Sequence, residues 1–229
     1  MTYGTHHGTG WIEVICGSMF SGKTEELIRR LRRAVIARQR VAIFKPVVDD
    51  RYAVDELVTH DRTSIPSQPV RHPREILELA GDAQVLGIDE VQFFDRTIVE
   101  VCQQLAAEGR RVIVAGLDTD YRGHPFEPVP ELMAVAEDVT KTHAVCVICG
   151  NPAIRTQRVV RRGDRILVGG SEAYEPRCRR CFVPPEESSG DLFDPAAKAG
   201  AKDAAKAAAK DAPAGRRRQG RGREGEDEA

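Results

Sequence analysis

Eight consecutive residues near the N-terminus have the composition of a phosphate-binding loop. Gly17-Ser18-Met19-Phe20-Ser21-Gly22-Lys23-Thr24 matches the pattern G-x-x-x-x-G-K-[ST]. Glycine lets backbone N–H groups approach phosphate oxygens closely, at a helix end that already favours anions. We expect Lys23 to reach the β- and γ-phosphates of a nucleoside triphosphate and the Thr24 hydroxyl to bind Mg²⁺. A turn without a ligand is disfavoured, because an apolar strand segment precedes the loop and a segment of helical period follows it.

A pair of carboxylates, Asp89 and Glu90, ends another apolar segment. If that segment is a strand, the pair lies at the C-terminal edge of a sheet, where ligands bind in open α/β folds. Asp89 suits the acidic position beside the metal ion, and Glu90 could take a proton from an attacking hydroxyl or water. An isolated Asp-Glu pair would be interpreted as a solvated loop, but the phosphate loop upstream favours the catalytic interpretation.

Four of the six cysteines form two C-x-x-C pairs, Cys146 with Cys149 and Cys178 with Cys181. This spacing predicts a structural Cys₄ zinc site, with disulfides as the weaker alternative. Such a site leaves no open coordination position, so the zinc would hold shape and perform no chemistry. Cys16 and Cys102 lie in apolar patterns and are interpreted as core thiols.

The segment between the two cysteine pairs leaves two interpretations open. Its stretch 168–174 has two adjacent glycines and Tyr174, so it could fold over a small planar ligand. Alternatively, it is an ordinary zinc-ribbon surface that contacts protein or nucleic acid.

Apolar strand segments alternate with segments of helical period along the first part of the chain. Strands are predicted at Trp11–Cys16, Val41–Lys45, Val85–Asp89 and Val112–Leu117, and helices at Glu25–Gln39, Arg74–Leu79 and Thr97–Glu108. In the first helix, Leu27, Leu31, Ala34 and Val35 are predicted to form the buried stripe. The alternation predicts an α/β fold, with a P-loop NTPase-like, mainly parallel sheet flanked by helices.

The chain is predicted to have three parts. Residues 1–143 form the α/β domain, and residues 144–184 form a small zinc-bound β-hairpin domain with strands at Ile154–Val160 and Arg165–Val168. Residues 185–229 are dominated by charged and small residues, which cannot bury enough apolar surface to offset the entropy of ordering. We therefore predict a disordered, charged tail.

Charge and hydropathy exclude several classes of protein. The 229 residues include 34 basic and 35 acidic side chains, so the chain lacks the basic surface expected of a nucleic-acid-binding protein. It also lacks an apolar run of the roughly 20 residues that a membrane-spanning helix needs, and its N-terminus does not resemble a signal peptide. We expect a cytoplasmic protein with no membrane or nucleic-acid partner.

Several motifs together resemble those of the thymidine kinases of the cytosolic, zinc-containing type, the type II family. The resemblance spans residues 10–184 and rests on Gly17–Thr24, Thr59-His-Asp-Arg62, Asp89-Glu-Val-Gln-Phe-Phe94, Gly116-Leu-Asp-Thr-Asp-Tyr121 and Val168-Gly-Gly170 with Tyr174 and Cys178, in the same order. It implies transfer of the γ-phosphate of ATP to the 5′-hydroxyl of thymidine, giving dTMP for nucleotide salvage, with Mg²⁺ and a structural Zn²⁺. It also implies a homotetramer that thymidine triphosphate inhibits.

The resemblance assigns a role to each matching position. Glu90 becomes the proton acceptor, Thr24 and Asp89 the magnesium ligands, and Cys146, Cys149, Cys178 and Cys181 the zinc ligands. Contacts to ATP and its phosphates are implied for Gly17, Ser18, Met19, Phe20, Ser21, Gly22, Lys23, Thr24, Asp89, Gln92 and Arg62. The nucleoside pocket and its lasso loop are implied to comprise Met19, Asp61, Leu117, Tyr121, Arg165, Ile166, Leu167, Val168, Gly169 and Tyr174.

Three positions depart from common members of the family. Ser18 stands where many relatives have Pro, Tyr121 where Phe is common, and Cys181 where some relatives use His. Tyr121 adds a hydroxyl to the pocket wall, which affects substrate tolerance more than reaction type. Both Cys and His suit zinc.

Two other functions use the same residues. In a P-loop ATPase, Glu90 would activate water and the zinc hairpin would contact a macromolecule. In a binding module, the catalytic residues would be vestigial. Asp61 and the Gly-Gly loop have no role in the ATPase, and a requirement for thymidine in ATP consumption would discriminate among the three.

Overall fold

The computed structural model describes residues 9–47, 56–58, 64–160 and 173–185. All of them belong to one compact unit, Met1–Pro185, and the chain from Glu186 onward lies outside the described residues. Within the described residues, no helix is both long and apolar enough to cross a membrane.

A six-stranded sheet forms the centre of this unit, with strand order β5-β2-β6-β7-β1-β8. The strands are β1 (Trp11–Gly17), β2 (Val41–Pro46), β5 (Gln68–Val70), β6 (Val85–Ile88), β7 (Arg111–Leu117) and β8 (Asp138–Thr142). Every neighbouring pair is parallel, which confirms the predicted fold class. The edge strands β5 and β8 were not predicted, because β5 is short and contains Pro69, and β8 is largely polar.

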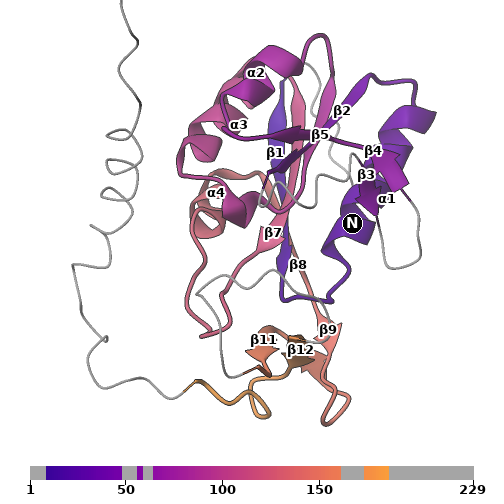
Figure 1. Ribbon diagram of the computed structural model, residues 1–229. Helices are drawn as coiled ribbons and strands as arrows, with labels where there is room; N and C mark the ends of the chain where they lie inside the picture. The colour runs from indigo at the N-terminus through magenta and orange to yellow at the C-terminus, as the bar shows by residue number, and fades with distance from the viewer. Residues whose placement is uncertain (1–8, 48–55, 59–63, 161–172, 186–229) are drawn as a thin grey trace, which may run out of the picture. The chain divides into compact units, whose positions relative to one another are not determined.

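Helices cover both faces of the sheet (Figure 1). Helix α1 (Lys23–Ile36) packs on one face, and α2 (Glu75–Leu79), α3 (Thr97–Ala107) and α4 (Val129–Val135) pack on the other. Alternate residues of β1 enter the two cores: Val14 and Cys16 face α3, while Ile15 faces α1.

The buried face of α1 differs at one position from the predicted stripe. Leu27, Leu31 and Ala34 are buried as expected, whereas Val35 is 58% exposed. The correction follows from helical geometry, because Ile28 takes the buried place one turn from Leu31 and Val35 turns away from the sheet.

Short antiparallel pairs follow the sheet. They are β9 (Ala144–Val145) with β10 (Pro152–Ala153) and β11 (Arg155–Arg158) with β12 (Tyr174–Arg177). A further pair joins β3 (Glu56–Val58) to β4 (Ser64–Pro66). The sequence predicted Arg165–Val168 as the partner of β11, but that segment lies outside the described residues. The partner that the structure describes is β12, which leads directly into Cys178.

Candidate active site

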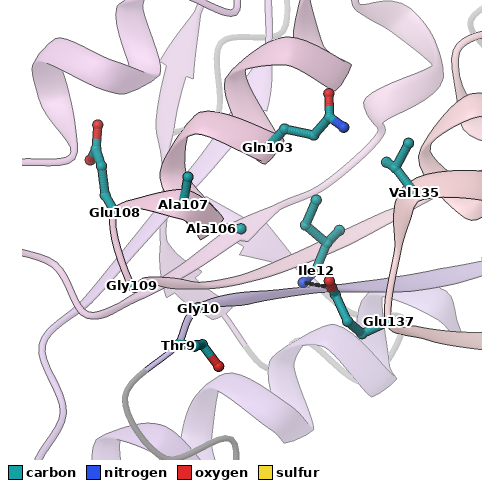
Figure 2. Close-up of a pocket in the computed structure, with 10 residues that line it drawn as sticks. All are labelled: Thr9, Gly10, Ile12, Gln103, Ala106, Ala107, Glu108, Gly109, Val135 and Glu137. Carbon is teal, nitrogen blue, oxygen red and sulfur yellow. Dashed lines mark hydrogen bonds between the residues drawn. The ribbon is translucent and has the colours of Figure 1, made fainter.

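The two ends of β1 have different surroundings. At its beginning, a hollow of about 510 Å³ is lined by Thr9, Gly10, Ile12, Gln103, Ala106, Ala107, Glu108, Gly109, Val135 and Glu137. Figure 2 shows Glu137 accepting a hydrogen bond from the Ile12 N–H, at 2.7 Å. None of the residues predicted to act lies in this hollow. They gather at the other end of β1, roughly 20 Å away for a seven-residue strand.

The phosphate loop connects the C-terminal end of β1 to the start of α1. Gly17 has φ 148°, and a Cβ there would lie 2.4 Å from the carbonyl oxygen of Thr142 on β8. Gly22, with φ 78°, is the residue before α1. Both glycines are therefore required by the backbone, as the motif predicts.

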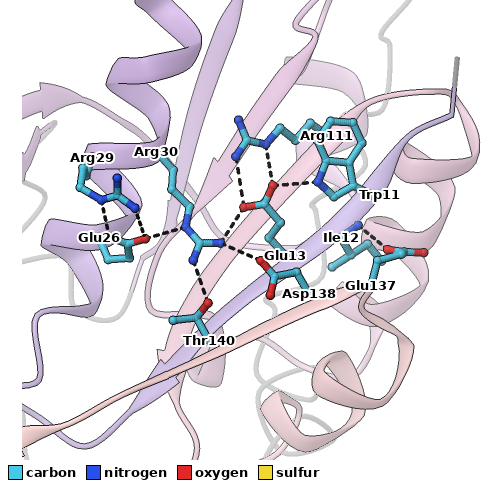
Figure 3. Close-up of polar contacts among 10 residues, drawn as sticks. All are labelled: Trp11, Ile12, Glu13, Glu26, Arg29, Arg30, Arg111, Glu137, Asp138 and Thr140. Carbon is cyan, nitrogen blue, oxygen red and sulfur yellow. Dashed lines mark hydrogen bonds and ion pairs between the residues drawn. The ribbon is translucent and has the colours of Figure 1, made fainter. Parts of the chain in front are cut away.

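A network of buried charges holds α1 against the sheet (Figure 3). The Glu13 carboxylate on β1 accepts hydrogen bonds from Arg30 of α1, at 2.6 Å, and from Arg111 of β7, at 2.6 Å. Arg30 also donates to Glu26, at 2.8 Å, and to Thr140 of β8, at 2.8 Å. Because α1 begins at the phosphate loop, this network fixes the direction in which the loop leaves the sheet.

Lys23, the lysine of the motif, is almost fully buried. It is 8% exposed, and its Nζ donates a hydrogen bond of 2.8 Å to the carbonyl oxygen of Ser18. Burial lowers the pKa of Lys23, and the carboxylates of Glu90, Asp89 and Asp118 oppose that shift. The ammonium group is thus held inside the loop, where a phosphate charge would compensate for its lost solvation.

Thr24 and Asp89 form a pair of oxygen donors. The Thr24 hydroxyl donates to Asp89 Oδ2 at 2.9 Å, and Asp89 Oδ1 accepts the backbone N–H of Glu90 at 2.9 Å. Burial, followed by the charge of Glu90, raises the pKa of Asp89 to about 7. One carboxylate and one hydroxyl beside a phosphate loop are the donor set by which such enzymes hold Mg²⁺.

Glu90 has an uncommon backbone conformation, and hydrogen bonds connect its side chain to the end of β7. Its φ is 53°, in the left-handed region, and its side chain accepts a hydrogen bond from Gln92 Nε2. The other end of the Gln92 amide accepts the N–H of Leu117 at 3.0 Å. At Gly116, a Cβ would approach Gln92 Oε1 to 2.9 Å, so glycine makes room for this link. The position of Glu90 is therefore set from β7.

Three residues predicted for the nucleoside pocket meet at β11. The Met19 N–H donates to the Thr156 hydroxyl at 3.0 Å, and the Arg158 guanidinium lies 5.1 Å from the centre of the Tyr121 ring. Tyr174, at the start of β12, pairs with Arg158 across the antiparallel ladder and is buried. Leu117, the fourth described residue predicted for this pocket, is the last residue of β7 and lies at the C-terminal edge of the six-stranded sheet.

Sequence reasoning missed Thr156 and Arg158 as residues of this site. They are two positions apart on one strand and so share a face, a signal that the strand prediction could have supplied. It also missed Asp118, which is buried at the end of β7 and pairs with Lys141 Nζ at 2.5 Å. Asp61, Arg62, Arg165, Ile166, Leu167, Val168 and Gly169 lie outside the described residues.

The four predicted zinc ligands converge. The sulfur atoms of Cys146, Cys149, Cys178 and Cys181 all lie within 4.8 Å of one another. A tetrahedral site with Zn–S bonds of about 2.3 Å has sulfurs about 3.8 Å apart. The Cys149 and Cys178 sulfurs are 3.6 Å apart, near that spacing and well beyond the roughly 2.05 Å of a disulfide. The cluster has the geometry of a zinc site.

Each cysteine pair sits on a tight turn of backbone. In the first, the Gly150 N–H donates to the Cys146 carbonyl oxygen at 2.8 Å. In the second, the Cys181 N–H donates to the Cys178 carbonyl oxygen at 3.1 Å. Such turns direct both sulfurs of a pair to one point, which explains why two residues separate the cysteines in each.

The fold and this sheet edge define a P-loop enzyme of the phosphoryl-transfer class. Comparison with protein families narrows the class: residues 10–182 match the family model described as thymidine kinase. The chain belongs to the thymidine kinase family, and it is an ATP-dependent phosphotransferase with thymidine kinase activity.

Individual relatives agree with the family model. A thymidine kinase of Rhodothermus sp. (strain ITI 518) is 61% identical over 185 residues, which cover 80% of this chain and 87% of the relative. A thymidine kinase of Bdellovibrio bacteriovorus is 56% identical over 179 residues, covering 78% and 88%. One of Bacteroides thetaiotaomicron is 53% identical over 174 residues, covering 76% and 87%.

Proposed function

We propose that Glu90 accepts the proton of the thymidine 5′-hydroxyl as that oxygen attacks the γ-phosphorus of ATP. The link from Leu117 through Gln92 to Glu90 carries this proposal, because it holds the carboxylate at the sheet edge beside the phosphate loop. The left-handed backbone of Glu90 is a further sign of function, since such conformations persist only where the surrounding structure enforces them.

The phosphate loop and the Thr24–Asp89 pair serve the other substrate. Lys23 balances the charge of the β- and γ-phosphates, and Thr24 and Asp89 are the residues that would hold Mg²⁺. When bound, the ion neutralises charge on the transferred phosphoryl group. Gln92 acts here by orienting Glu90, and Arg62 is proposed to contact the phosphates.

The nucleoside occupies the side of the site that faces β11. Met19, Leu117, Tyr121 and Tyr174 are proposed as its wall, and the convergence of Met19, Tyr121 and Tyr174 at β11 supports this assignment. Asp61 and the lasso residues 165–169 complete the proposed pocket by resemblance. Zn²⁺ bound by the four cysteines is proposed to hold the two ends of the lasso together.

A comparison of ATP consumption with and without thymidine tests the assignment of roles. We expect dTMP and ADP to form in equal amounts with thymidine, and negligible phosphate release without it. The Lys23→Ala variant is the control for nucleotide-dependent turnover. Thymidine-independent hydrolysis at a comparable rate would support the ATPase alternative, in which Glu90 activates water.

Four further predictions accompany the proposal. The division into domains 1–143 and 144–184 with a disordered tail from 185 stays a prediction that limited proteolysis can test.

Light scattering tests the predicted homotetramer, and activity assays with thymidine triphosphate test the expected inhibition. A four-thiol zinc site favours a reducing compartment such as the cytoplasm, which fractionation of cells would check.

A further inference from the structure

Phe20 occupies a strained position in the middle of the phosphate loop. Its φ is 63°, in the left-handed region that residues other than glycine rarely adopt. Such a conformation persists only when the surroundings enforce it. Neither the fold nor the chemistry of phosphate binding requires an aromatic side chain at this position, so its contacts must explain it.

The side chain of Phe20 packs against the cysteine cluster. The buried centre of that cluster consists of Ala144, Cys146, Ala153 and Cys178, and the ring of Phe20 contacts it together with Cys149 and Cys181. Phe20 therefore belongs to the phosphate loop by sequence and to the zinc-binding segment by packing. Its ring packs against the small apolar cluster that contains the cysteines.

The two residues before Phe20 also contact the zinc-binding segment. The Ser18 hydroxyl donates to the carbonyl oxygen of Ala153 at 3.4 Å, and Ser18 is fully buried. The Met19 N–H donates to the Thr156 hydroxyl at 3.0 Å. Three consecutive residues of the phosphate loop thus rest on the strands that the cysteines hold in place.

We propose that Phe20 is a positioning residue that couples zinc binding to ATP binding. The proposal rests on the assignment of the loop to ATP and of the cysteines to zinc. With zinc bound, the four sulfurs stay together and present a fixed apolar surface, on which Phe20 holds the loop in its strained, phosphate-ready shape. Without the metal, that surface loosens and the strain at Phe20 relaxes, so ATP must reorder the loop.

Thermodynamic linkage makes the coupling reciprocal. If zinc raises the affinity for ATP by some factor, ATP raises the affinity for zinc by the same factor. The resemblance to the family implies that the zinc hairpin serves the thymidine side of the site. The packing of Phe20 extends the influence of the zinc hairpin to the ATP side of the site.

The test measures the zinc affinity of the intact protein by equilibrium competition with a chelator, with and without Mg²⁺ and a non-hydrolysable ATP analogue. We expect the analogue to raise the zinc affinity of the wild-type protein by at least about fivefold, the lower end of typical coupling. Phe20→Ala should reduce that effect to less than twofold and weaken binding of the analogue, measured by calorimetry. Thymidine binding should change less than binding of the analogue.

Two variants separate positioning from general damage. Phe20→Tyr keeps the ring and should retain the coupling. Phe182→Leu removes the aromatic ring of the residue that follows Cys181. Because that ring packs on Arg155 and does not belong to the phosphate loop, this variant should also retain the coupling. Circular dichroism confirms folding of each variant.

Each outcome has a defined meaning. A wild-type protein that binds the analogue but keeps an unchanged zinc affinity would overturn the coupling and leave the thymidine kinase assignment intact. Full coupling in Phe20→Ala, or equal loss of coupling in Phe182→Leu, would remove Phe20 from the positioning role. If Phe20→Ala does not fold, Phe20→Leu, which removes the ring but keeps an apolar side chain, takes its place with the same expected loss of coupling. Failure of the wild-type protein to bind the analogue at all would instead contradict the proposed ATP site.

Discussion

Two groups of buried charges lie at opposite ends of the sheet, one around Glu13 of β1 and one around Lys23 and Asp89, and they differ in how completely they are paired. Glu13, near the beginning of β1, accepts hydrogen bonds from Trp11, Arg30 and Arg111. Burial alone would raise the pKa of Glu13, but these donors outweigh it and the pKa is lowered. At the other end, Asp89 has its pKa raised to about 7 and Lys23 has its pKa lowered, because burial dominates.

Under the proposed function, the contrast separates charges that stabilise the fold from charges that bind ligands. The Glu13 network satisfies its charges within the protein, so it needs no ligand and stabilises the arrangement of α1 and the sheet. At the catalytic edge, no ion pair within the described residues joins Lys23 to Asp89 or Glu90. Under the proposed function, bound phosphates and Mg²⁺ would complete the stabilisation of these groups, and perturbed pKa values are common at functional sites.

The largest effect is expected from Glu90→Gln. The substitution keeps the shape and the hydrogen bond from Gln92 but removes the base, so kcat should fall roughly 10²–10⁴-fold. Binding of a non-hydrolysable ATP analogue should stay nearly unchanged. The control is Glu100→Gln, an exposed carboxylate of α3 that pairs weakly with Arg74. Near-normal turnover of the Glu90 variant would place the base elsewhere.

Arg30→Met tests the group of buried charges around Glu13. It leaves Glu13 without one of its buried partners, so the free energy of unfolding should fall by about 3–5 kcal/mol in denaturant titrations. Arg29→Met is a matched control, since Arg29 bonds the same Glu26 but is 50% exposed where Arg30 is 5% exposed. That change should cost about 0–1 kcal/mol. Equal losses in the two variants would end the distinction between them.

Lys23→Ala tests the group of charges at the phosphate loop by removing its cation. Loss of a charged donor to phosphate costs about 1.5–3 kcal/mol, or roughly 10–100-fold in affinity for the ATP analogue. The free energy of unfolding should fall little, because the buried ammonium loses solvation in the folded state. Thymidine affinity is the internal control. Unchanged affinity for the analogue would contradict the assignment of the phosphate loop.

The pH dependence of nucleotide binding gives the smallest expected effect. Since the folded-state pKa of Asp89 is about 7 and the unfolded value is about 4, the free protein binds a proton over this range. This group therefore makes the fold less stable as pH rises from about 4 to 7. Because Mg²⁺ favours the carboxylate, binding of Mg²⁺ with the analogue should release a proton below pH 7 and tighten as pH approaches 7.

Calorimetry in buffers of different ionisation enthalpy counts those protons. We expect release approaching one proton at pH 6 and little at pH 8. The control is Asp138→Asn, which changes an exposed carboxylate that pairs with Arg30, away from the phosphate loop. Proton release that does not vary between these pH values would show that Asp89 is already ionised in the free protein.

Local sequence patterns determined the chemistry of this protein and most of its fold class. The phosphate loop, the Asp89–Glu90 pair and the two cysteine pairs are each contiguous or separated by two residues, so their spacing alone predicts a turn or a strand end. Buried parallel strands are nearly continuous apolar runs, which made β1, β2, β6 and β7 recognisable. The polar edge strand β8 has no such signal.

Only the tertiary structure decided how these parts act together. The links from Leu117 through Gln92 to Glu90, from Glu13 to Arg30 and Arg111, and from Phe20 to the cysteines join residues far apart in the chain. No periodicity or spacing encodes such contacts, because they depend on strand order and on which face each side chain takes. Tertiary structure also sets the pKa directions, through the hydrogen-bond donors around Glu13 and through the burial of Asp89. The sequence therefore determined which groups are candidates for catalysis, and the packing of distant segments decided which carboxylates are neutralised by buried ion pairs and which are not.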